Sequence, residues 1–590
     1  MAYKIIDRCV CCHTCATNCP VEAITFQGSQ YWIDPEVCIS CGTCAPLCPQ
    51  SIIEDENAPQ ITPAPHAPEE RSCDLCVIGA GGGGLVAAIR FAQLTGKKVI
   101  VLEKAKKCGG STTLAHNWFT GYNRWHQEAG IPDQTEKLLK YCIREAQGCL
   151  PDSLVEKVLR NTGRFFEWLV DFDEKEAREC FAIGRGPMGA LGIDYPDRKF
   201  ENLKCHDPAI GPGWAGTYLI RKMLQVAPTL GVEVYTQHEA VKLLTDENGA
   251  VSGVVANNPG GTVTVHAGAV VLATGGFSGN DEKLRKFEPN FFDGGIPVHR
   301  FSPVTCSGDG MLLSEPLGAW CNMKKTKLNK FGPVHHPYTA SGCAMAGFGS
   351  MMVDFRGNLV EMPMGPMGDT SFLDNLPEHA VWYIVSEKTV DEKLRDSVAH
   401  PREGNKGMTY EDYRAEIDFE LKSRGPAYCA DTLEALAEKL GMDPAVFTAS
   451  VSAYNESLNA PKSPMMPFEP ENEEDAGNPS FHNDDVDHGD DGPGLPPPPP
   501  AEPITDGPFY AFLGQRFAEG AFGGVMTNED VEVIRKDGTV IPGLYAVGDA
   551  ASTWYTRGVL GPLTELTWAV NSGYFAADSA KNYLSESSSQ

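Results

Sequence analysis

The sequence predicts an α/β protein in which a small cysteine-rich α+β domain precedes a larger domain with a nucleotide-binding strand–helix–strand pattern. Two observations carry this prediction. Nine of the 20 cysteines fall within the first 48 residues, and a glycine-rich turn follows an apolar segment near residue 79. At roughly 150 residues per domain, a chain of 590 residues suggests three or four compact units.

The composition and charge of the chain argue against several classes of function. A chain with 42% hydrophobic and 22% charged residues is ordinary globular protein. Its formal net charge of −29 repels phosphate backbones, so we expect no nucleic-acid partner. The longest apolar stretches, such as 76–89, are glycine-rich and shorter than the about 20 residues of a transmembrane helix. The N-terminus lacks the pattern of a secretory signal, so we expect a cytoplasmic protein with no transmembrane segment.

The first 55 residues carry the spacing C-x2-C-x2-C-x3-C-P twice. The two copies consist of Cys9, Cys12, Cys15 and Cys19, and of Cys38, Cys41, Cys44 and Cys48. Three closely spaced thiolates hold one iron–sulfur cluster, and the fourth cysteine of each run reaches the other cluster. The predicted ligand sets are therefore Cys9, Cys12, Cys15 and Cys48 for one cluster, and Cys38, Cys41, Cys44 and Cys19 for the other. This head resembles a bacterial ferredoxin with two [4Fe-4S] clusters.

Two other kinds of site could use these cysteines. Residues 9–13 also read C-x-x-C-H, a c-type haem attachment signature, but haem explains neither Cys15 nor Cys19 nor the second copy. Four-cysteine zinc sites are the other possibility, and the repeated spacing with its trailing proline favours iron–sulfur clusters. Cys11 lies outside the motif and is expected to be structural.

A dinucleotide motif follows the head. Residues 73–78 form an apolar strand that leads into Gly79-x-Gly81-x-x-Gly84, an alanine-rich helix and a second strand ending at Glu103. Glycines let the backbone approach a pyrophosphate at the helix N-terminus, and the acid binds a ribose hydroxyl. Because the motif lies between a strand and a helix and Glu103 follows Gly79 by 24 positions, it predicts a Rossmann-like dinucleotide site.

The rest of the chain resembles the flavoproteins related to fumarate reductase and succinate dehydrogenase. The matching segments, in the family's order, are 109–112, 269–280, 307–319, 508–511, 523–525 and 541–550. The resemblance implies FAD, with Asp549 near its ribityl chain and the backbone of Leu563 and Thr564 facing its isoalloxazine ring. The G-x-G-x-x-G spacing recurs at 184–189 and 211–216, but neither copy lies between an apolar strand and a helix, so we expect electrons from the iron–sulfur head rather than from a nicotinamide cofactor.

The motif and the resemblance together give a set of expected FAD-binding residues. These are Gly79, Gly81, Gly84, Glu103, Lys104, Gly110, Ser111, Thr112, Ala240, Val241, Ala273, Thr274, Gly275, Asp309, Gly548, Asp549, Leu563 and Thr564. Covalent flavin attachment, found in part of this family, needs a histidine just after the Gly-Gly-Ser segment. Because Thr112 stands at that place, we expect FAD to be bound non-covalently.

The family also carries a capping domain inserted into its FAD-binding domain. The resemblance therefore implies a Rossmann-like α/β FAD domain interrupted by an α+β capping domain that shields the substrate from water. The expected boundaries are 1–55 for the ferredoxin-like domain, 56–72 for a linker, 73–332 and 506–590 for the FAD domain, and 333–505 for the cap. Within the cap, residues 472–505 are acidic and proline-rich and are expected to form a solvated insertion.

The chain matches some of the substrate-binding positions of this family and departs from others. His336-Pro337 matches the family's His-Pro, which implies that His336 donates a hydrogen bond to the substrate. Where the family has a proton-delivery arginine, a second substrate histidine and a carboxylate-binding arginine, this chain has Leu359, Gly520 and Val559. A site without these groups is short of positive charge for a small dicarboxylate, so an enone or a monocarboxylic enoate is the expected substrate. Arg557 is the candidate replacement for the lost arginine.

Tyrosines are the candidate proton donors. Ketosteroid dehydrogenases of the same superfamily use tyrosines for proton handling, and Tyr510, which lies where such a tyrosine is expected, is the first candidate. Tyr555 and Tyr338 lie in the two other segments that the resemblance places at the active site. Each of the three is as readily explained as a core or rim aromatic residue.

These observations predict an FAD-dependent oxidoreductase that acts on CH–CH bonds. It would reduce the activated double bond of a small molecule with electrons from an external low-potential donor, such as a ferredoxin or another electron-transfer protein. Two alternatives stay open. One is sulfur-oxyanion chemistry of the adenylylsulfate reductase type, against which the missing basic residues argue. The other is a non-catalytic electron-transfer subunit, against which the His-Pro motif argues.

Overall fold

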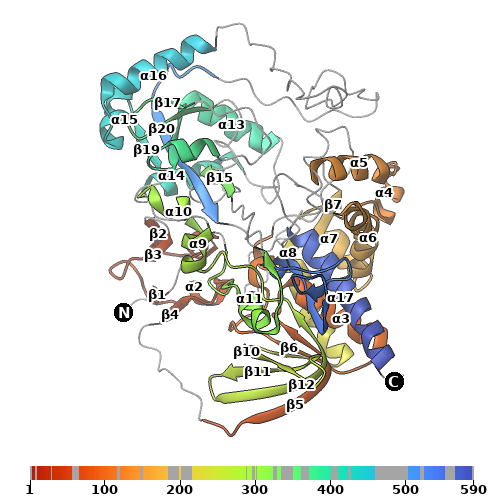
Figure 1. Ribbon diagram of the computed structural model, residues 1–590. Coiled ribbons are helices and arrows are strands. Elements are labelled where there is room, and N and C mark those ends of the chain that lie inside the picture. The colour runs from red at the N-terminus through yellow and green to blue at the C-terminus, as the bar shows by residue number, and fades with distance from the viewer. Residues whose placement is uncertain are drawn as a thin grey trace.

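The computed structural model shows a head, a large sheet and a capping domain as three parts of one chain (Figure 1). The residues it describes are 3–6, 9–12, 14–27, 30–55, 65–115, 120–146, 151–183, 198–200, 215–287, 289–295, 299–300, 302–322, 329–333, 350–360, 371–399, 409–422, 427–458, 502–518, 524–551 and 565–587.

The head consists of two short helices and two antiparallel strand pairs. Its elements are β1 (Tyr3–Ile5), α1 (Thr14–Thr17), β2 (Ile24–Gln27), β3 (Gln30–Ile33), α2 (Cys44–Leu47) and β4 (Ile53–Asp55). Strand β1 pairs with β4 and β2 pairs with β3, so the two ends of the head meet. Phe26 and Tyr31 on the β2–β3 hairpin are fully buried, with edge-to-face rings 5.6 Å apart.

The FAD-binding region is built on an eight-stranded sheet with the order β10-β11-β12-β5-β6-β9, to which β23 adds beside β12 and β22 beside β23. The strands are β5 (Glu69–Ile78), β6 (Val99–Leu102), β9 (Val232–Tyr235), β10 (Glu239–Thr245), β11 (Val251–Asn258), β12 (Gly261–Leu272), β22 (Glu532–Ile534) and β23 (Val540–Ala546). The pairs β12–β5, β5–β6, β6–β9 and β12–β23 are parallel. The carboxyl ends of these strands therefore meet at one edge, where nucleotides bind in such sheets.

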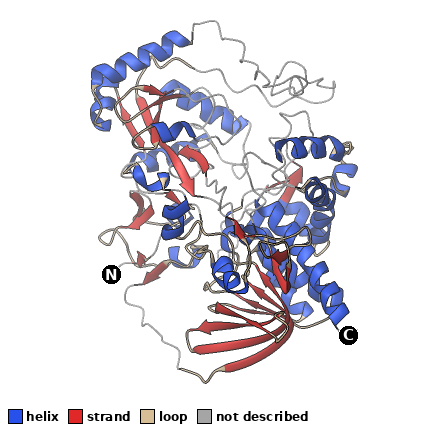
Figure 2. Ribbon diagram, viewed as in Figure 1, coloured by secondary structure: helices blue, strands red, loops and turns tan. Residues whose placement is uncertain are grey.

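Helices α3 (Gly82–Thr95) and α17 (Glu565–Ser587) pack directly on this sheet. The other helices of this region are α4 (Arg124–Glu128), α5 (Thr135–Ala146), α6 (Asp152–Val170), α7 (Glu174–Cys180) and α8 (Ala215–Val226), drawn in blue in Figure 2. Of these, α8 packs on α3, α6 on α17, and α5 on α6. Glycine allows α3 and α17 to approach closely, because a Cβ at Gly573 would lie 2.3 Å from the carbonyl oxygen of Gly83. No described helix has both the length and the apolar character that crossing a bilayer requires.

The capping domain contains a seven-stranded sheet. Its strands are β13 (His299–Arg300), β15 (Asn329–Pro333), β16 (Met351–Val353), β17 (Leu359–Val360), β18 (Ala380–Ser386), β19 (Ala427–Ala430) and β20 (Phe509–Ala518). Its helices are α13 (Glu387–Ala399), α14 (Tyr410–Lys422), α15 (Leu433–Leu440) and α16 (Pro444–Ser457).

The described chain also contains short helices and strands outside these two sheets. They are β7 (Phe181–Ile183), β8 (Arg198–Phe200), α9 (Asp281–Phe287), α10 (Asn290–Asp293), α11 (Asp309–Ser314), β14 (Cys321–Asn322) and β21 (Gly524–Val525).

Both boundaries of the cap differ from the sequence prediction, because β13 and β15 of the capping sheet begin before residue 333. The segment 506–518 was expected in the FAD domain, but β20 pairs with β15, β18 and β19 of the capping sheet. The physical reason is burial on both faces: Phe509 and Ala511 pack into one apolar cluster, and Tyr510 and Phe512 pack into another. The cap therefore extends through Ala518. The 472–505 insertion lies almost entirely outside the described residues.

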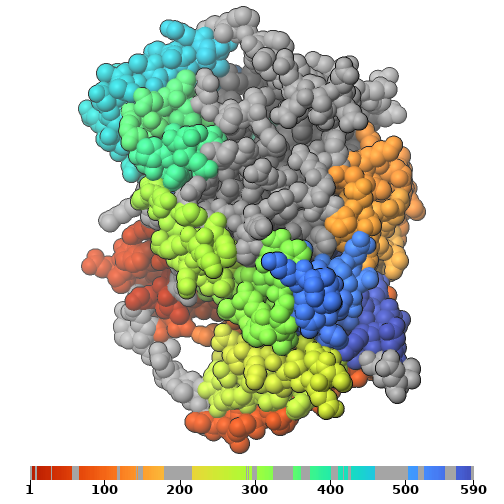
Figure 3. Space-filling model, in the orientation of Figure 1, coloured from red at the N-terminus to blue at the C-terminus, as the bar shows by residue number. Residues whose placement is uncertain are grey.

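The head contacts both of the other parts, and Figure 3 shows it at the side of the molecule in red. Toward the cap, the ring of Tyr31 stacks on Phe419 of α14 with centroids 6.2 Å apart. Toward the FAD-binding region, Lys106 Nζ lies 2.7 Å from Glu54 Oε1, and Lys107 donates to the carbonyl oxygen of Cys48 at 2.9 Å. The head is thus packed onto the body of the protein.

Candidate cofactor and cluster sites

The three glycines of the G-x-G-x-x-G turn have different roles. Gly79 has a φ of +107°, and a Cβ there would lie 2.2 Å from the carbonyl oxygen of Ala273. A Cβ at Gly84 would lie 2.1 Å from the carbonyl oxygen of Gly79, so the fold itself requires both glycines. A Cβ at Gly81 would meet no protein atom closer than 3.8 Å. Gly81 therefore leaves open space on the cavity side, where the pyrophosphate of a dinucleotide can approach the main chain.

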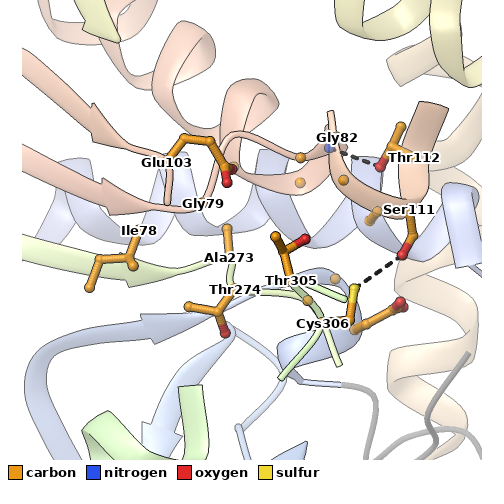
Figure 4. A pocket seen from close by; sticks show the side chains of 18 of the residues that line it. Ile78, Gly79, Gly82, Glu103, Ser111, Thr112, Ala273, Thr274, Thr305 and Cys306 are labelled. Carbon is orange, nitrogen blue, oxygen red and sulfur yellow. Dashed lines mark hydrogen bonds between the residues drawn. The ribbon is translucent and has the colours of Figure 1, made fainter. Parts of the chain in front are cut away.

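A cavity opens at the N-terminus of α3, and Figure 4 shows the side chains around it. Fifteen of the predicted FAD-binding residues line it: Gly79, Gly81, Gly84, Glu103, Lys104, Gly110, Ser111, Thr112, Ala240, Ala273, Thr274, Gly275, Asp309, Gly548 and Asp549. These residues come from the ends of several strands and from the loops that follow them. The structure therefore brings segments more than 400 residues apart to one place, as a dinucleotide site needs.

Three predicted residues are not among those that line this cavity. The side chain of Val241 is 46% exposed, because the β10–β11 register shifts between Ala240 and Lys242 and leaves Val241 in a bulge. Leu563 and Thr564 lie outside the described residues.

Glu103 fixes the glycine turn to the end of β6. Its Oε2 accepts a hydrogen bond from the backbone N–H of Ala80, and its Oε1 accepts one from that of Ala105, both at 2.8 Å. Burial raises the pKa of this carboxyl, and the two N–H groups act in the opposite direction. Each oxygen retains acceptor capacity for a ribose hydroxyl.

A polar cluster and an unpartnered hydroxyl face the same cavity. Lys104 Nζ donates to Asp309 Oδ2 at 2.5 Å and also to the hydroxyl of Ser307, which donates to Asp309 Oδ1 at 2.7 Å. The buried hydroxyl of Thr274 has no hydrogen-bond partner among the described residues. An orphan hydroxyl among the residues that line a cavity at a helix N-terminus fits a bound polar cofactor such as FAD.

The Gly-Gly-Ser-Thr segment closes another side of the cavity. Thr112 Oγ1 accepts a hydrogen bond from the N–H of Gly82 at 3.0 Å, and Ser111 Oγ lies 3.3 Å from Cys306 Sγ (Figure 4). Burial raises the pKa of the Cys306 thiol to about 11, which keeps it neutral near pH 7. Cys306 was not predicted because it lies just outside the matched segment 307–319, and Ser307 lies inside that segment but was not singled out.

The head contains a second cavity, lined by the sulfur-bearing residues of one predicted ligand set. These are Cys9, Cys12, Cys15 and Cys48, with apolar neighbours that include Ile5, Val10 and Ile52. Within the described ranges, no three His, Cys, Asp or Glu side chains are placed to hold a single metal ion. Four cysteines around a shared space, rather than around one point, fit an iron–sulfur cluster better than zinc.

The other predicted set is closer to solvent. Burial, with added repulsion from Cys38, Cys19 and Cys41, raises the pKa of the Cys44 thiol to about 11. Cys41 is exposed, and its Sγ lies 3.3 Å from the hydroxyl of Thr43. The backbone N–H of Ala23 donates to Cys19 Sγ at 3.3 Å, the kind of contact that tunes cluster potentials.

Most predicted substrate-contacting residues cannot be placed. His336, Tyr338, Tyr555 and Arg557 lie outside the described residues, as do Gly520 and Val559. Leu359 lies on β17 and packs against an apolar cluster of the cap.

Tyr510 is described, and its contacts lie within the cap. It is only 4% exposed, and it faces α13 and α14 with Phe512. Its hydroxyl donates to Glu387 Oε2 at 2.5 Å and accepts from Arg414 Nη2 at 3.5 Å. Burial and the hydrogen bond to Glu387 both raise the pKa of Tyr510. Tyr510 is not among the residues that line the FAD cavity, so these contacts favour a structural role.

The parallel sheet, the glycine turn and the cavity together define a dinucleotide-binding flavoprotein. The chain belongs to the FAD binding domain family, whose model matches residues 74–559. Residues 31–54, which include the second cysteine run, match the 4Fe-4S binding domain. The predictions of an FAD-binding domain and of an iron–sulfur motif are thus confirmed.

Curated relatives agree with the predicted resemblance. The chain is 27% identical over 485 residues to NADH:fumarate oxidoreductase of Klebsiella pneumoniae (strain 342), a match that covers 81% of this chain and 44% of that protein. It therefore spans less than half the length of this relative. It is 26% identical over 497 residues to urocanate reductase of Eggerthella lenta, covering 82% of this chain and 71% of the relative.

Solved structures confirm the fold. The open conformation of a flavocytochrome c3 fumarate reductase superposes with a TM-score of 0.61 at 20% identity, covering 87% of this chain and 78% of that chain. A 3-ketosteroid delta1-dehydrogenase from Sterolibacterium denitrificans superposes with a TM-score of 0.62 at 18% identity, covering 87% of this chain and 100% of that chain. The FAD-binding fold is that of the fumarate reductase flavoproteins.

Proposed function

We propose that this protein reduces the activated C=C bond of an enone or a monocarboxylic enoate, using electrons that pass through two [4Fe-4S] clusters to FAD. The observation that carries the proposal is that one chain holds an FAD cavity and, in a head packed against the same domain, a cavity lined by four cysteines. An external low-potential one-electron donor, such as a ferredoxin, supplies the electrons.

The residues of the chain bind the cofactor and prepare the substrate. Bound FAD accepts electrons and delivers a hydride to a substrate carbon. The α3 N-terminus and Gly81 receive the pyrophosphate, and Glu103 binds the ribose. We assign to His336 and Arg557 the polarisation of the substrate carbonyl, which stabilises the negative charge that hydride addition creates there.

Protonation of the second carbon completes the reaction, since a C=C bond takes up two electrons and two protons. A general acid within hydrogen-bond reach is needed for this step. The contacts of Tyr510 with Glu387 and Arg414 favour a role in holding the cap together. In this proposal the proton therefore comes from Tyr338 or Tyr555, and Tyr510 keeps a structural part.

The substrate class rests on lost charges and on relatives. Gly520 and Val559 stand where the family has a substrate histidine and a carboxylate-binding arginine, and Leu359 stands where it has a proton-delivery arginine. One relative is named for urocanate, an aromatic enoate with a single carboxylate. Both observations support a substrate larger and less charged than fumarate.

Reoxidation of the flavin tests the proposal directly. The anaerobic protein is reduced and freed of excess reductant, and then mixed with enones, aryl enoates or fumarate while flavin absorbance is followed. We expect at least one enone or aryl enoate to reoxidise the flavin faster than fumarate does, with the saturated product identified by mass spectrometry. Efficient fumarate reduction, or no reoxidation by any activated alkene, would overturn the proposal.

A further inference from the structure

Two buried side chains separate the FAD cavity from the four-cysteine cavity. Leu114 lines the FAD cavity, and Val10 lines the cavity of Cys9, Cys12, Cys15 and Cys48. Val10 and Leu114 pack against each other with Cys12 at their edge, and both are at most 4% exposed. A contact between two buried apolar side chains thus connects the lining of one cavity to the lining of the other.

The two cysteine sets differ in their access to solvent. In the set of Cys19, Cys38, Cys41 and Cys44, the thiol of Cys41 is exposed, and its neighbour Ile39 is 61% exposed. In the other set, Cys15 and Cys48 are buried. We call the first set the outer site and the second set, beside Val10, the inner site.

A lysine of the FAD-binding region holds the inner site in place. Lys107 Nζ donates to the carbonyl oxygens of Pro46 at 3.0 Å and of Cys48 at 2.9 Å. Lys107 lies four residues after Glu103, so one short segment lines the FAD cavity at one end and anchors an inner-site ligand at the other. Lys106, its neighbour, instead forms an exposed ion pair with Glu54.

We propose that the inner site is the exit through which electrons reach FAD, across the Val10–Leu114 contact, and that Lys107 is the positioning residue that aligns it. This inference rests on the proposed function only for the presence of the clusters and FAD, and it needs no particular substrate. A cluster held at the inner site would pass one electron to the flavin in each transfer, and the external donor would replace that electron through the outer site. Two such electrons with one proton from solvent would make up the hydride, and the proposed tyrosine would add the second proton that one C=C bond takes up.

The first measurement is a potential. Full-length Lys107→Met and Lys106→Met proteins are titrated anaerobically while cluster signals are followed by electron paramagnetic resonance. Cys12→Ala, which removes an inner ligand, identifies the inner signal. A nearby positive charge stabilises the more negative, reduced cluster, so Lys107→Met should lower the inner potential alone. A shift of about 59 mV in a one-electron potential corresponds to a tenfold change in the equilibrium constant for reduction of the cluster. Lys107→Arg should restore the potential, and Lys106→Met should change neither signal.

The second measurement is the rate of flavin reduction by a reduced ferredoxin with no substrate present. We expect slower flavin reduction in Lys107→Met than in Lys106→Met, with equal FAD and iron contents. An unchanged inner potential and flavin reduction rate in Lys107→Met, or the same shift in Lys106→Met, would overturn the inference. Because no alkene is used, failure of the proposed substrate class would leave this result standing.

Discussion

The FAD cavity and the capping domain differ in what determines the place of their key residues. In the cavity, close backbone contacts do so: Gly79, Gly84 and Glu103 each meet a main-chain atom of a neighbouring segment. In the cap, Tyr510 owes its place to strand pairing with Val385 and to contacts with two helices. A site built from backbone is readable from a local motif, whereas a site built from side chains depends on partners that lie far away in the chain.

The largest expected effect concerns the FAD cavity, where main-chain contacts determine the place of the key residues. Gly81→Leu should abolish FAD binding, because the new side chain would occupy the space left for the pyrophosphate. The fold should survive, since no protein atom lies within 3.8 Å of a Cβ at this position. FAD released by acid and the thermal unfolding midpoint are the two measurements.

Gly84→Ala is the matched control. Its Cβ would lie 2.1 Å from the carbonyl oxygen of Gly79, so we expect loss of stability as well as loss of FAD. If Gly81→Leu and Gly84→Ala behaved alike, the separate roles assigned to these glycines would be wrong.

The next effect concerns the head. Two clusters predict about eight irons and eight sulfides per chain in anaerobically purified protein. Cys12→Ala or Cys41→Ala should each halve the iron content and slow turnover driven by a ferredoxin, yet spare reoxidation of pre-reduced flavin by substrate. Iron and sulfide analysis and two kinetic assays check this. Zinc in place of iron would contradict the cluster assignment.

The match between sequence and structure follows the same division. The glycine turn and the iron–sulfur motif were predictable because their chemistry fixes the spacing of near neighbours. Val241 was misplaced because a bulge, invisible in the sequence, turns it away from Ala240. Strand β20 was assigned to the other domain because its partner β18 lies about 130 residues earlier in the chain, and no local signal encodes such a pairing.

A smaller effect is expected at the substrate. His336→Ala should lower turnover by about 100- to 1000-fold, the usual loss when a donor to a developing oxyanion is removed. FAD and iron contents should not change, because His336 is assigned to the substrate alone. His335→Ala, which removes the adjacent histidine without motif support, is the control. Equal turnover in the two variants would remove His336 from the proposed site.

The smallest expected effect concerns Tyr510 in the capping domain, where side-chain contacts determine the place of the residue. Tyr510→Phe removes the hydroxyl that donates to the half-buried carboxylate of Glu387, which keeps its ion pair with Arg414. Losing one intramolecular hydrogen bond costs about 0.5 to 1.5 kcal/mol, so the unfolding midpoint should fall while turnover per bound FAD stays unchanged. Tyr545→Phe is the control, because the buried Tyr545 hydroxyl has no hydrogen-bond partner among the described residues and its loss should cost nothing. A Tyr510→Phe protein of full stability whose turnover fell about 100-fold or more, the effect of losing a general acid, would instead show that this tyrosine handles the proton. In that case the cap would contribute to the chemistry as well as to shielding the substrate.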